Sequence, residues 1–415
     1  MKGNYFIIGL ILLTFFVISF LTNMIGPLVP DIIKSFDLSL TLVALLPFAF
    51  FIAYGLMSIP SGMLIERYGE KQIMVAAFLL SALGAFLFAG APSYAMYILS
   101  LFFIGAGMAM LQVAINPLLR TAGGEANFAF NSVMGQLFFG LASFLSPLMY
   151  TYLVLNIAKE GATQNAIVRT LTAIVPPDLP WISLYWVFAI VSLAMVLIIG
   201  FVRFPKVERK EDEKTGAIKT HLDLLKNPMV MLYFLAIFAY VGTEQGVANW
   251  ISKFLETYHG LDPQTTGAST ISWYWGLMTA GAFLGLVMLK FMDSRRVLIL
   301  FTSAAIICFT ISLLGPTAVV LITFPLIGFF ASVMWSIIIS LALNSVEKNH
   351  GSLSGILVTG IAGGAIVPLM VGGLGDLFGL KVGMLFLYLT FGYILSIGFW
   401  AKPLITNQLL GKRKA

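Results

Sequence analysis

Long uninterrupted apolar blocks constrain this chain more than any other feature. Residues 5–29, 71–92 and 380–401 each contain at most one charged side chain. A helix of about 20 such residues is long enough to cross the hydrocarbon core of a bilayer. Backbone groups in lipid must find their hydrogen bonds within the membrane, and these blocks do not alternate as barrel strands do. The blocks therefore predict an all-α integral membrane protein.

The whole chain follows this pattern, because 59% of its residues are hydrophobic and only 10% are charged. The expected spans are residues 5–29, 40–65, 71–91, 94–120, 128–155, 181–202, 228–252, 267–289, 297–315, 317–345, 352–375 and 380–401. A polar, highly charged stretch separates the first six spans from the last six. The predicted domains are an N-terminal six-helix bundle at 1–203, a cytoplasmic linker at 204–227, a C-terminal six-helix bundle at 228–405 and a cytoplasmic tail at 406–415.

Positive charge gathers on one side of this arrangement. Nineteen of the 24 Lys and Arg residues lie in segments that share a side with the N-terminus, and five lie on the other side. Such a bias sets orientation, since cytoplasmic loops carry the excess of basic residues. We therefore expect a bacterial inner-membrane protein with both termini in the cytoplasm. Because the net charge of +6 is spread over alternate loops, it does not indicate a nucleic-acid partner.

Several classes of site are missing from the sequence. There is no G-x4-G-K-[ST] phosphate loop for ATP-driven pumping. The three histidines lie between the predicted spans, so they offer neither a metal cluster nor a proton relay inside the membrane. The single cysteine, Cys308, cannot form an intrachain disulfide. We expect neither an enzyme nor a bound metal or organic cofactor.

The two halves of the chain share a short pattern. In the fifth predicted span Gly135 is followed by Pro147, and in the eleventh Gly355 is followed by Pro368. A leucine and a methionine come directly after each of these prolines. Matching small residues and prolines in corresponding spans are typical of transporters built from two structural repeats.

The loop between the second and third spans carries a specific motif. Gly62, Glu66, Arg67, Gly69 and Lys71 occur in the order G-x-L-x-[DE]-R-x-G-x-[KR]. This motif resembles the signature of the major facilitator superfamily. The resemblance implies a twelve-helix fold of two bundles around a central cavity that opens alternately to each side. It also implies that the charged residues of the motif pair with helix ends when the cytoplasmic gate is closed.

Amide and tryptophan side chains inside the spans are the candidate substrate ligands. An amide both donates and accepts hydrogen bonds, which suits the hydroxyl groups of a neutral polyol, and an indole can support a sugar ring. An amide can equally serve as a hydrogen bond between helices. The predicted substrate-binding residues are Asn23, Gln112, Asn116, Gln136, Gln245, Asn249, Trp273 and Trp335.

Glu244 is the candidate for cation coupling. It lies well inside the seventh predicted span, where an acidic side chain costs roughly 2.5–3.5 kcal/mol. A carboxyl group in a wet cavity could carry a proton when neutral or bind Na⁺ when ionised. In the alternative interpretation Glu244 lies near the outer end of the helix and is held by Lys253 or by lipid headgroups.

Pieces of three spans resemble the fucose–galactose–glucose symporter group within the superfamily. They are Asn116-Pro117 in the fourth span, Tyr240-Val-Gly-Thr-Glu244 in the seventh, and Asn23 with a following Leu-x-Pro in the first. The resemblance implies uptake of a hexose or related polyol by alternating access, coupled to H⁺ or Na⁺. We expect the monomer to be functional.

Two positions depart from that group. Its fucose-transporting members have carboxylates where this chain has Gly26 and Gln112, which leaves Glu244 as the remaining coupling candidate. The alternatives are a sugar uniporter without coupling, or an exporter of drugs or other organic solutes on the same fold.

Overall fold

The computed structural model describes residues 5–124, 128–157, 165–205, 207, 218–346 and 349–404. These residues form helices joined by short connections, and no strand occurs among them. Twelve helical segments are long and apolar enough to cross a membrane: Tyr5–Phe36, Leu40–Tyr68, Glu70–Gly90, Tyr94–Gly123, Asn131–Ile157, Pro180–Phe201, Pro228–Ala248, Pro263–Phe291, Ser294–Leu314, Thr317–Leu343, Gly351–Phe378 and Leu380–Trp400. The twelve predicted spans and the all-α class are confirmed.

The chain divides into two compact units. Unit 1 consists of Met1–Glu208 and Asn249–Ser272, and unit 2 consists of Arg209–Ala248 and Trp273–Ala415. The segment Asn249–Ser272, which comes from the second half of the sequence, therefore packs with the first half. The predicted domain boundaries stay a prediction. Most of the predicted linker, and all of the predicted tail, lie outside the described residues.

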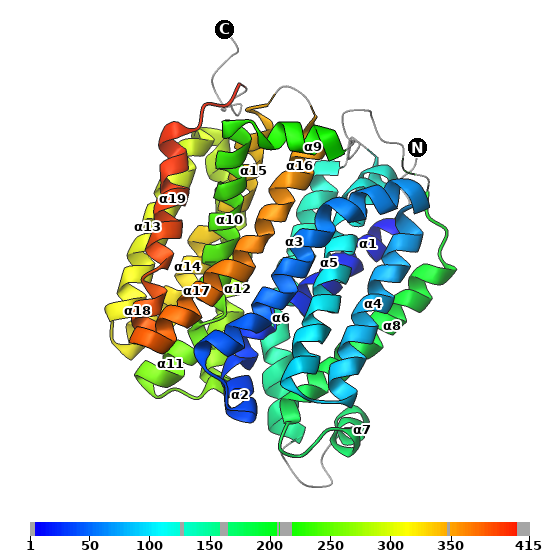
Figure 1. Ribbon diagram of the computed structural model, residues 1–415, viewed down its shortest axis with the longest axis vertical. Helices are drawn as coiled ribbons and strands as arrows, with labels where there is room; N and C mark the ends of the chain where they lie inside the picture. The colour runs from blue at the N-terminus through cyan, green and yellow to red at the C-terminus, as the bar shows by residue number, and fades with distance from the viewer. Residues whose placement is uncertain are drawn as a thin grey trace. The chain divides into compact units, whose positions relative to one another are not determined.

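Unit 1 contains the first six spans and the segment Asn249–Ser272 of the second half (Figure 1). Its elements are α1 (Tyr5–Thr22), α2 (Ile25–Phe36), α3 (Leu40–Tyr68), α4 (Glu70–Gly90), α5 (Tyr94–Gly123), α6 (Phe128–Ile157), α7 (Ala166–Ile174), η2 (Pro180–Ile182), α8 (Ser183–Phe201), α11 (Ile251–His259) and η4 (Pro263–Gly267).

Unit 2 contains most of the second half (Figure 1). Its elements are α9 (Ile218–Leu225), α10 (Pro228–Ala248), α12 (Ala268–Phe291, from Trp273 onward), α13 (Ser294–Leu314), α14 (Thr317–Ala331), α15 (Met334–Leu343), α16 (His350–Thr359), η5 (Gly360–Ala362), α17 (Gly363–Phe378), α18 (Leu380–Met384) and α19 (Leu387–Trp400).

Glycines let backbones approach closely at matching places in the two units. A Cβ added to Gly105 of α5 would lie 2.2 Å from the carbonyl oxygen of Phe50 in α3. A Cβ added to Gly328 of α14 would lie at the same 2.2 Å from the carbonyl oxygen of Tyr274 in α12. Small residues at helix interfaces are how membrane helices pack without a hydrophobic driving force. In each unit, a glycine of the fourth span therefore lets that span pack closely against the second span.

Two helix breaks contain an asparagine. The first span breaks between α1 and α2 at Asn23 and Met24, and α10 ends just before Asn249 and Trp250, after which α11 begins. Such interruptions near the membrane interior are where transporters place polar groups for their substrates. The first span also continues to Phe36, beyond its predicted end at residue 29. This extension brings Asp31 into a spanning segment.

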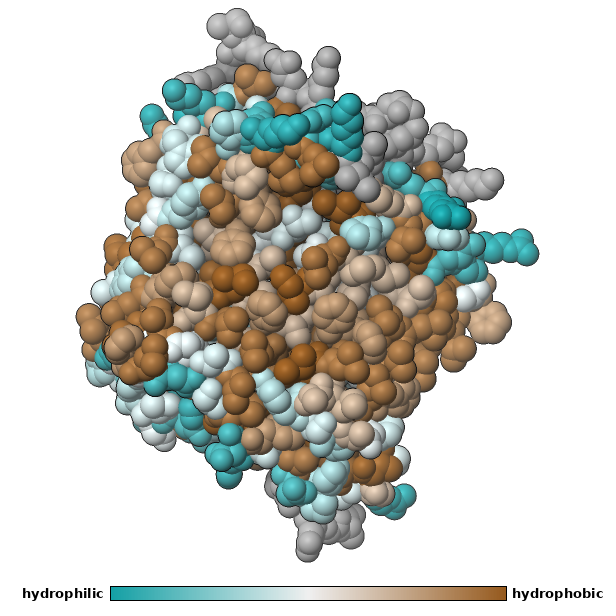
Figure 2. Space-filling view, viewed as in Figure 1, coloured by the Kyte–Doolittle hydropathy of each residue, from teal (hydrophilic) through white to brown (hydrophobic). Residues whose placement is uncertain are grey.

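The outer surface of the helices matches a lipid environment. On the face that Figure 2 shows, apolar side chains cover the middle of the helices, and hydrophilic side chains gather at their ends. Leu83, Leu197, Ile307, Ile322 and Leu389 are among the large apolar side chains that are strongly exposed. Contiguous apolar exposure on this scale is a membrane contact rather than a soluble surface.

Candidate functional site

The carboxylate of Glu244 is held within unit 2 by hydrogen bonds. The Tyr240 hydroxyl donates to Oε2 at 2.5 Å, and the Gln245 amide nitrogen donates to Oε1 at 3.1 Å. The Tyr274 hydroxyl donates to the backbone carbonyl of Glu244 at 3.3 Å. Each carboxyl oxygen of Glu244 therefore has a hydrogen-bond donor within its own unit.

The alternative interpretation of Glu244 assigned Lys253 as its partner. The ammonium group of Lys253 instead pairs with Glu256 at 2.7 Å, three residues further along α11. Both partners of that ion pair belong to unit 1. Nine residues of one continuous helix correspond to about 13.5 Å and two and a half turns, so Lys253 would lie on the opposite face from Glu244 even without a break. The break after Ala248 interrupts that helix.

Aromatic rings surround the Glu244 cluster. The ring of Tyr240 lies 6.1 Å from that of Trp335, and Tyr274 packs edge-on against Trp275 at 5.1 Å. Trp273 is 53% exposed and Trp275 only 4% exposed, so the two indoles point in different directions, as their spacing of two residues predicts. Of the two predicted tryptophans, the structure brings Trp335 to the Glu244 cluster, whereas Trp273 lies on an exposed face of α12.

The other seventh-span amides differ in their surroundings. Gln245 is buried beside Glu244 in unit 2, whereas Asn249 is buried in unit 1 at the helix break. The side-chain nitrogens of Asn249 and Trp250 are buried, and neither has a hydrogen-bond partner among the described residues. Buried donors without partners cost free energy, so such groups usually indicate a ligand or water that completes them.

The side-chain amide of Asn23 is hydrogen-bonded to serines of α1 and α6. Its amide nitrogen donates to the Ser143 hydroxyl at 2.8 Å and lies 3.4 Å from the Ser19 hydroxyl. Ser19 and Ser143 are themselves hydrogen-bonded at 2.6 Å, which joins α1 to α6. These contacts fit the interhelical alternative for this amide.

The remaining predicted amides of unit 1 have free side chains. Gln112 is half-buried, while Asn116 and Gln136 are exposed. None of the three makes a side-chain hydrogen bond to a described residue. Gln112 and Asn116 lie one turn apart on α5, so they share a face of that helix. Their role as substrate ligands stays a prediction.

The motif between α3 and α4 adopts the geometry that its glycine predicts. Gly69 has a φ of 85°, a backbone conformation that other residues rarely adopt, and it joins the two helices directly. Gly62 is buried, whereas Glu66 and Arg67 are exposed. The ammonium group of Lys71 donates to the carbonyl of Gly200, near the end of α8, at 2.7 Å.

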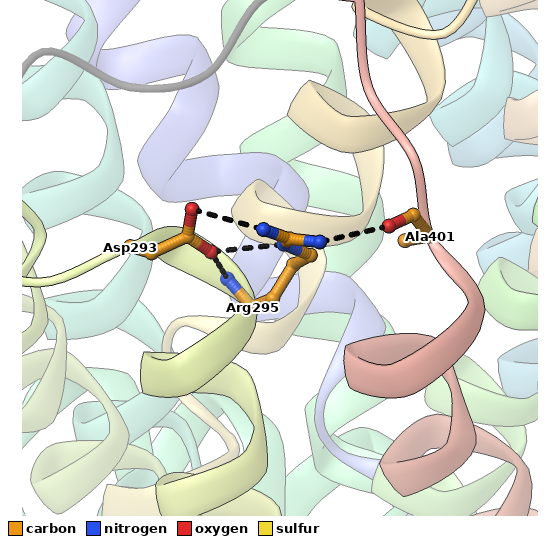
Figure 3. Close-up of polar contacts among 3 residues, drawn as sticks. All are labelled: Asp293, Arg295 and Ala401. Atoms are coloured by element: carbon orange, nitrogen blue, oxygen red, sulfur yellow. Dashed lines mark hydrogen bonds and ion pairs between the residues drawn. The ribbon is translucent and has the colours of Figure 1, made fainter.

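The corresponding connection in unit 2 lies between α12 and α13 (Figure 3). Asp293 accepts from the backbone nitrogen of Arg295 at 2.9 Å and pairs with its guanidinium at 3.0 Å, while that guanidinium also donates to the carbonyl of Ala401 at 3.3 Å. Partial burial acts to raise the pKa of the Asp293 carboxyl, but the hydrogen bonds and charge of Arg295 outweigh it and hold that pKa below its ordinary value.

A second acidic cluster was missed by the sequence analysis. Asp31 of α2 accepts hydrogen bonds from the hydroxyl of Tyr150 at 2.6 Å and from the amide of Gln264 at 3.0 Å. All three residues belong to unit 1. The signal that could have found Asp31 is the apolar pair Ile32 and Ile33, which continues the helix past the charge.

Comparisons with known proteins agree with this architecture. A sequence profile described as Major Facilitator Superfamily matches residues 11–368. The glucose/galactose transporter of Brucella abortus biovar 1 is 31% identical over 403 residues, which cover 96% of this chain and 94% of that protein. The L-fucose-proton symporter of Escherichia coli is 24% identical over 376 residues, covering 86% of this chain and 84% of that protein.

A solved structure shows the same fold. The crystal structure of the E. coli fucose:proton symporter matches with a TM-score of 0.69 at 23% identity, over 97% of this chain and 100% of that chain. At that identity the likeness concerns the fold alone. The profile match and the full-length relative show that this chain belongs to the Major Facilitator Superfamily and is a multi-pass membrane transporter rather than an enzyme.

Proposed function

We propose that this chain is a secondary transporter that takes up a hexose or a related polyol by alternating access, coupled to H⁺ or Na⁺ through Glu244. The observation that carries the sugar assignment is the near full-length similarity to a protein named as a glucose/galactose transporter. The free amides Gln112, Asn116 and Gln136 support it, because they can both donate to and accept from hydroxyl groups.

The break after α10 adds two further candidate ligands. Asn249 and Trp250 present buried donors that a sugar hydroxyl could satisfy. Gln245 donates to Glu244, so we assign it to holding the carboxylate. Trp335 beside Tyr240 is the candidate platform for a sugar ring, and the exposed Trp273 is the less favoured one. The hydrogen bonds of Asn23 favour a structural role for that residue.

The coupling role rests on the chemistry of Glu244. Its two oxygens receive hydrogen bonds from Tyr240 and Gln245, and no basic residue of the described chain is hydrogen-bonded to the carboxyl group. An acidic group without a fixed counter-charge can bind a transported cation in one state and release it in the other. We further propose that both termini face the cytoplasm and that the monomer is the working unit.

Uptake into liposomes tests the proposal directly. Purified protein is reconstituted and offered labelled glucose, galactose and fucose under an inward proton gradient, an inward sodium gradient, or neither. We expect accumulation of at least one sugar above equilibrium under one of the two gradients. Equal uptake with and without gradients would instead support a uniporter, and absence of sugar uptake or binding would contradict the substrate assignment.

Glu244→Gln separates coupling from substrate binding. The amide keeps the shape and one of the two acceptor oxygens but cannot carry the charge, so we expect uphill accumulation to be lost while sugar exchange across the membrane continues. The matched control is Glu256→Gln, which removes an acidic residue paired with Lys253 outside the membrane spans. Unchanged gradient-driven accumulation in Glu244→Gln would overturn the coupling role.

A further inference from the structure

Helix α7, which lies between the fifth and sixth spans, has an apolar side that is wider than its contact with the rest of unit 1. Four apolar side chains follow the spacing of one face of an amphipathic helix: Ile167, Val168, Leu171 and Ile174. Val168 and Leu171 are buried where α7 packs on α6. Ile167 and Ile174, in contrast, are 69% and 46% exposed. Half of the apolar side of α7 therefore lies on protein, and the other half is open.

The remaining side of α7 is polar and exposed. Arg169 follows Ile167 by two residues and Thr172 precedes Ile174 by two, a spacing that turns side chains to opposite sides of a helix. Both Arg169 and Thr172 are exposed. In Figure 1, α7 is seen nearly end-on at the lower end of unit 1, whereas the spans run from top to bottom, so α7 lies across them. An amphipathic helix with this orientation and a basic residue on its polar side is typical of a membrane surface.

A hydrogen bond fixes the depth of α7 along the fifth span. Asn165 caps α7 by accepting from the backbone nitrogen of Val168 at 2.9 Å, and its amide nitrogen donates to the Tyr152 hydroxyl at 2.8 Å. Tyr152 precedes the end of α6 at Ile157 by about 7.5 Å of helix. Helix α7 therefore begins beside the last turns of a spanning helix rather than beyond its end. Tyrosine is enriched at this depth, where the apolar core of a bilayer meets the headgroups.

The exposed isoleucines lie next to an apolar surface of α6. Large exposed side chains recur there every three or four residues, so they share one face of the helix: Leu141, Leu145, Leu148, Tyr152 and Leu155. An apolar stripe of this length on a spanning helix is a lipid contact. Because Asn165 is bonded to Tyr152, α7 begins at this stripe. The leaflet that covers the stripe therefore also reaches the start of α7, where Ile167 is exposed.

We propose that α7 is a membrane-surface helix, in which Ile167 and Ile174 enter the boundary between the headgroups and the acyl chains of a phospholipid leaflet. Arg169 and Thr172 face the headgroups and water. Five spans precede α7, so this leaflet lies on the side of the membrane opposite to the start of the first span. The partner is the bilayer itself, because uncharged aliphatic side chains beside a lipid-facing stripe match acyl chains. The inference requires only that the chain lies in a bilayer, and not that it carries a sugar.

Quenching of a fluorescent reporter by lipids tests this proposal directly. In a Cys308→Ser background, each of three single variants carries a fluorophore on one cysteine: Ile167→Cys, Ile174→Cys, and the matched control Thr172→Cys on the polar side. The purified protein is placed in nanodiscs with one chain per disc. We expect a nitroxide near the headgroup end of the acyl chain to quench the reporters at 167 and 174 at least threefold more strongly than the reporter at 172. Iodide in the water should give the reverse order, and equal quenching at all three positions would overturn the proposal.

Hydrogen exchange provides a second measurement that needs no label. A helix as short as α7 is marginal in water, so its contacts decide how often it opens. In the same nanodiscs, the double variant with Ile167→Ser and Ile174→Ser should exchange the backbone amides of α7 at least fivefold faster than the parent. Thr172→Ser, which keeps both isoleucines, should leave the rate unchanged. An unchanged rate in the double variant would contradict the proposal.

A second copy of the chain is the alternative occupant of the open side of α7. In that case the cysteine of Ile174→Cys would cross-link between chains in vesicles, and lipid quenching would be absent from discs that hold a single chain. That result would replace the lipid assignment. Strong lipid quenching in single-chain discs would instead support the membrane-surface helix, since no second copy is present there.

Discussion

In each unit a basic side chain at the start of one span is hydrogen-bonded to a carbonyl at the end of another, but the residues differ. In unit 1 the ammonium group of Lys71, at the start of the third span, donates to the carbonyl of Gly200 near the end of the sixth. In unit 2 the guanidinium of Arg295, at the start of the ninth span, donates to the carbonyl of Ala401 after the twelfth. The last carbonyls of a helix lack partners within it and attract positive charge. Both contacts therefore join two spans through one basic residue.

The two connections share a basic contact although the sequence motif occurs in only one of them. The glycine-containing spacing around Lys71 is absent from the unit 2 connection, yet the basic contact remains. In unit 2 Asp293 holds the guanidinium in place through an ion pair at 3.0 Å (Figure 3). The repeated requirement is thus a cation at a helix end, whereas the surrounding motif belongs to unit 1 alone.

The polar residues inside the spans differ between the two units more than the helix packing does. In unit 1 the polar link between α1 and α6 consists of the neutral residues Ser19, Asn23 and Ser143. In unit 2 the seventh span carries the carboxylate of Glu244 with Tyr240 and Gln245. The repeat conserves helix packing, because packing decides whether each unit folds. The acidic residues inside the spans differ between the units, because Asp31 lies in the first span of unit 1 and Glu244 in the seventh span.

The largest effects should come from the paired glycines. Gly105→Ala and Gly328→Ala each place a Cβ 2.2 Å from a backbone carbonyl, so we expect each to destabilise the protein by about 1–3 kcal/mol. Thermal unfolding in detergent measures this. The controls are Gly9→Ala in α1 and Gly392→Ala in α19, where an added Cβ meets nothing within 4 Å. A large effect in one unit and none in the other would break the equivalence of the two packing sites.

Removing the contacts of Arg295 and Lys71 should reduce the stability of the protein by smaller and unequal amounts. Arg295→Met removes the ion pair with Asp293 and the bond to Ala401, so we expect a loss of about 1 kcal/mol. Lys71→Met removes a single exposed bond and should cost about 0.5 kcal/mol. The same thermal measurement compares them, with Lys381→Met as a control away from both contacts. A greater loss in Lys71→Met would reverse the proposed order.

The spans were predictable from sequence because lipid imposes a local rule. Any segment that crosses the bilayer must be long, apolar and helical, so composition alone located all twelve. The position of Gly69 in a tight connection was also predictable, since few other residues adopt its φ of 85°. Glu244 was identifiable as a charge inside a span, without any knowledge of its partners.

The partners themselves could not be predicted, because they depend on how helices rotate and pack. Nothing in the spacing of Asn23 indicates that Ser143, on a distant span, would take its amide. Asp31 was left outside the predicted spans, because the first of them ended at residue 29. The packing of Asn249–Ser272 within unit 1 is a long-range property that no local pattern contains.

Neutral polar links should contribute equally in the two units. Asn23→Leu removes the bond to Ser143, while Ser19 and Ser143 keep theirs; Thr243→Val removes the bond from α10 to Thr390 of α19, which measures 2.6 Å. Hydrogen bonds between membrane helices average about 0.6 kcal/mol, so we expect both variants to lose approximately that amount. A loss several times larger in Asn23→Leu alone would show that this amide does more than join two helices.

The smallest effect should be a pH dependence confined to unit 2. Because the folded protein holds the pKa of Asp293 below its ordinary value of 3.8, ionised Asp293 stabilises the folded state. That contribution is present above the ordinary pKa and is lost as the pH falls through the lower, folded value. The Asp293→Asn variant should therefore unfold slightly earlier than the parent at neutral pH, and the two should converge as the pH falls below about 4. Lys71 has no acidic partner in its contact with Gly200, so Lys71→Met should differ from the parent by the same amount at both pH values. If Lys71→Met and the parent became equally stable at low pH while Asp293→Asn and the parent did not, the pH-dependent contact would lie in unit 1 and the prediction would be wrong.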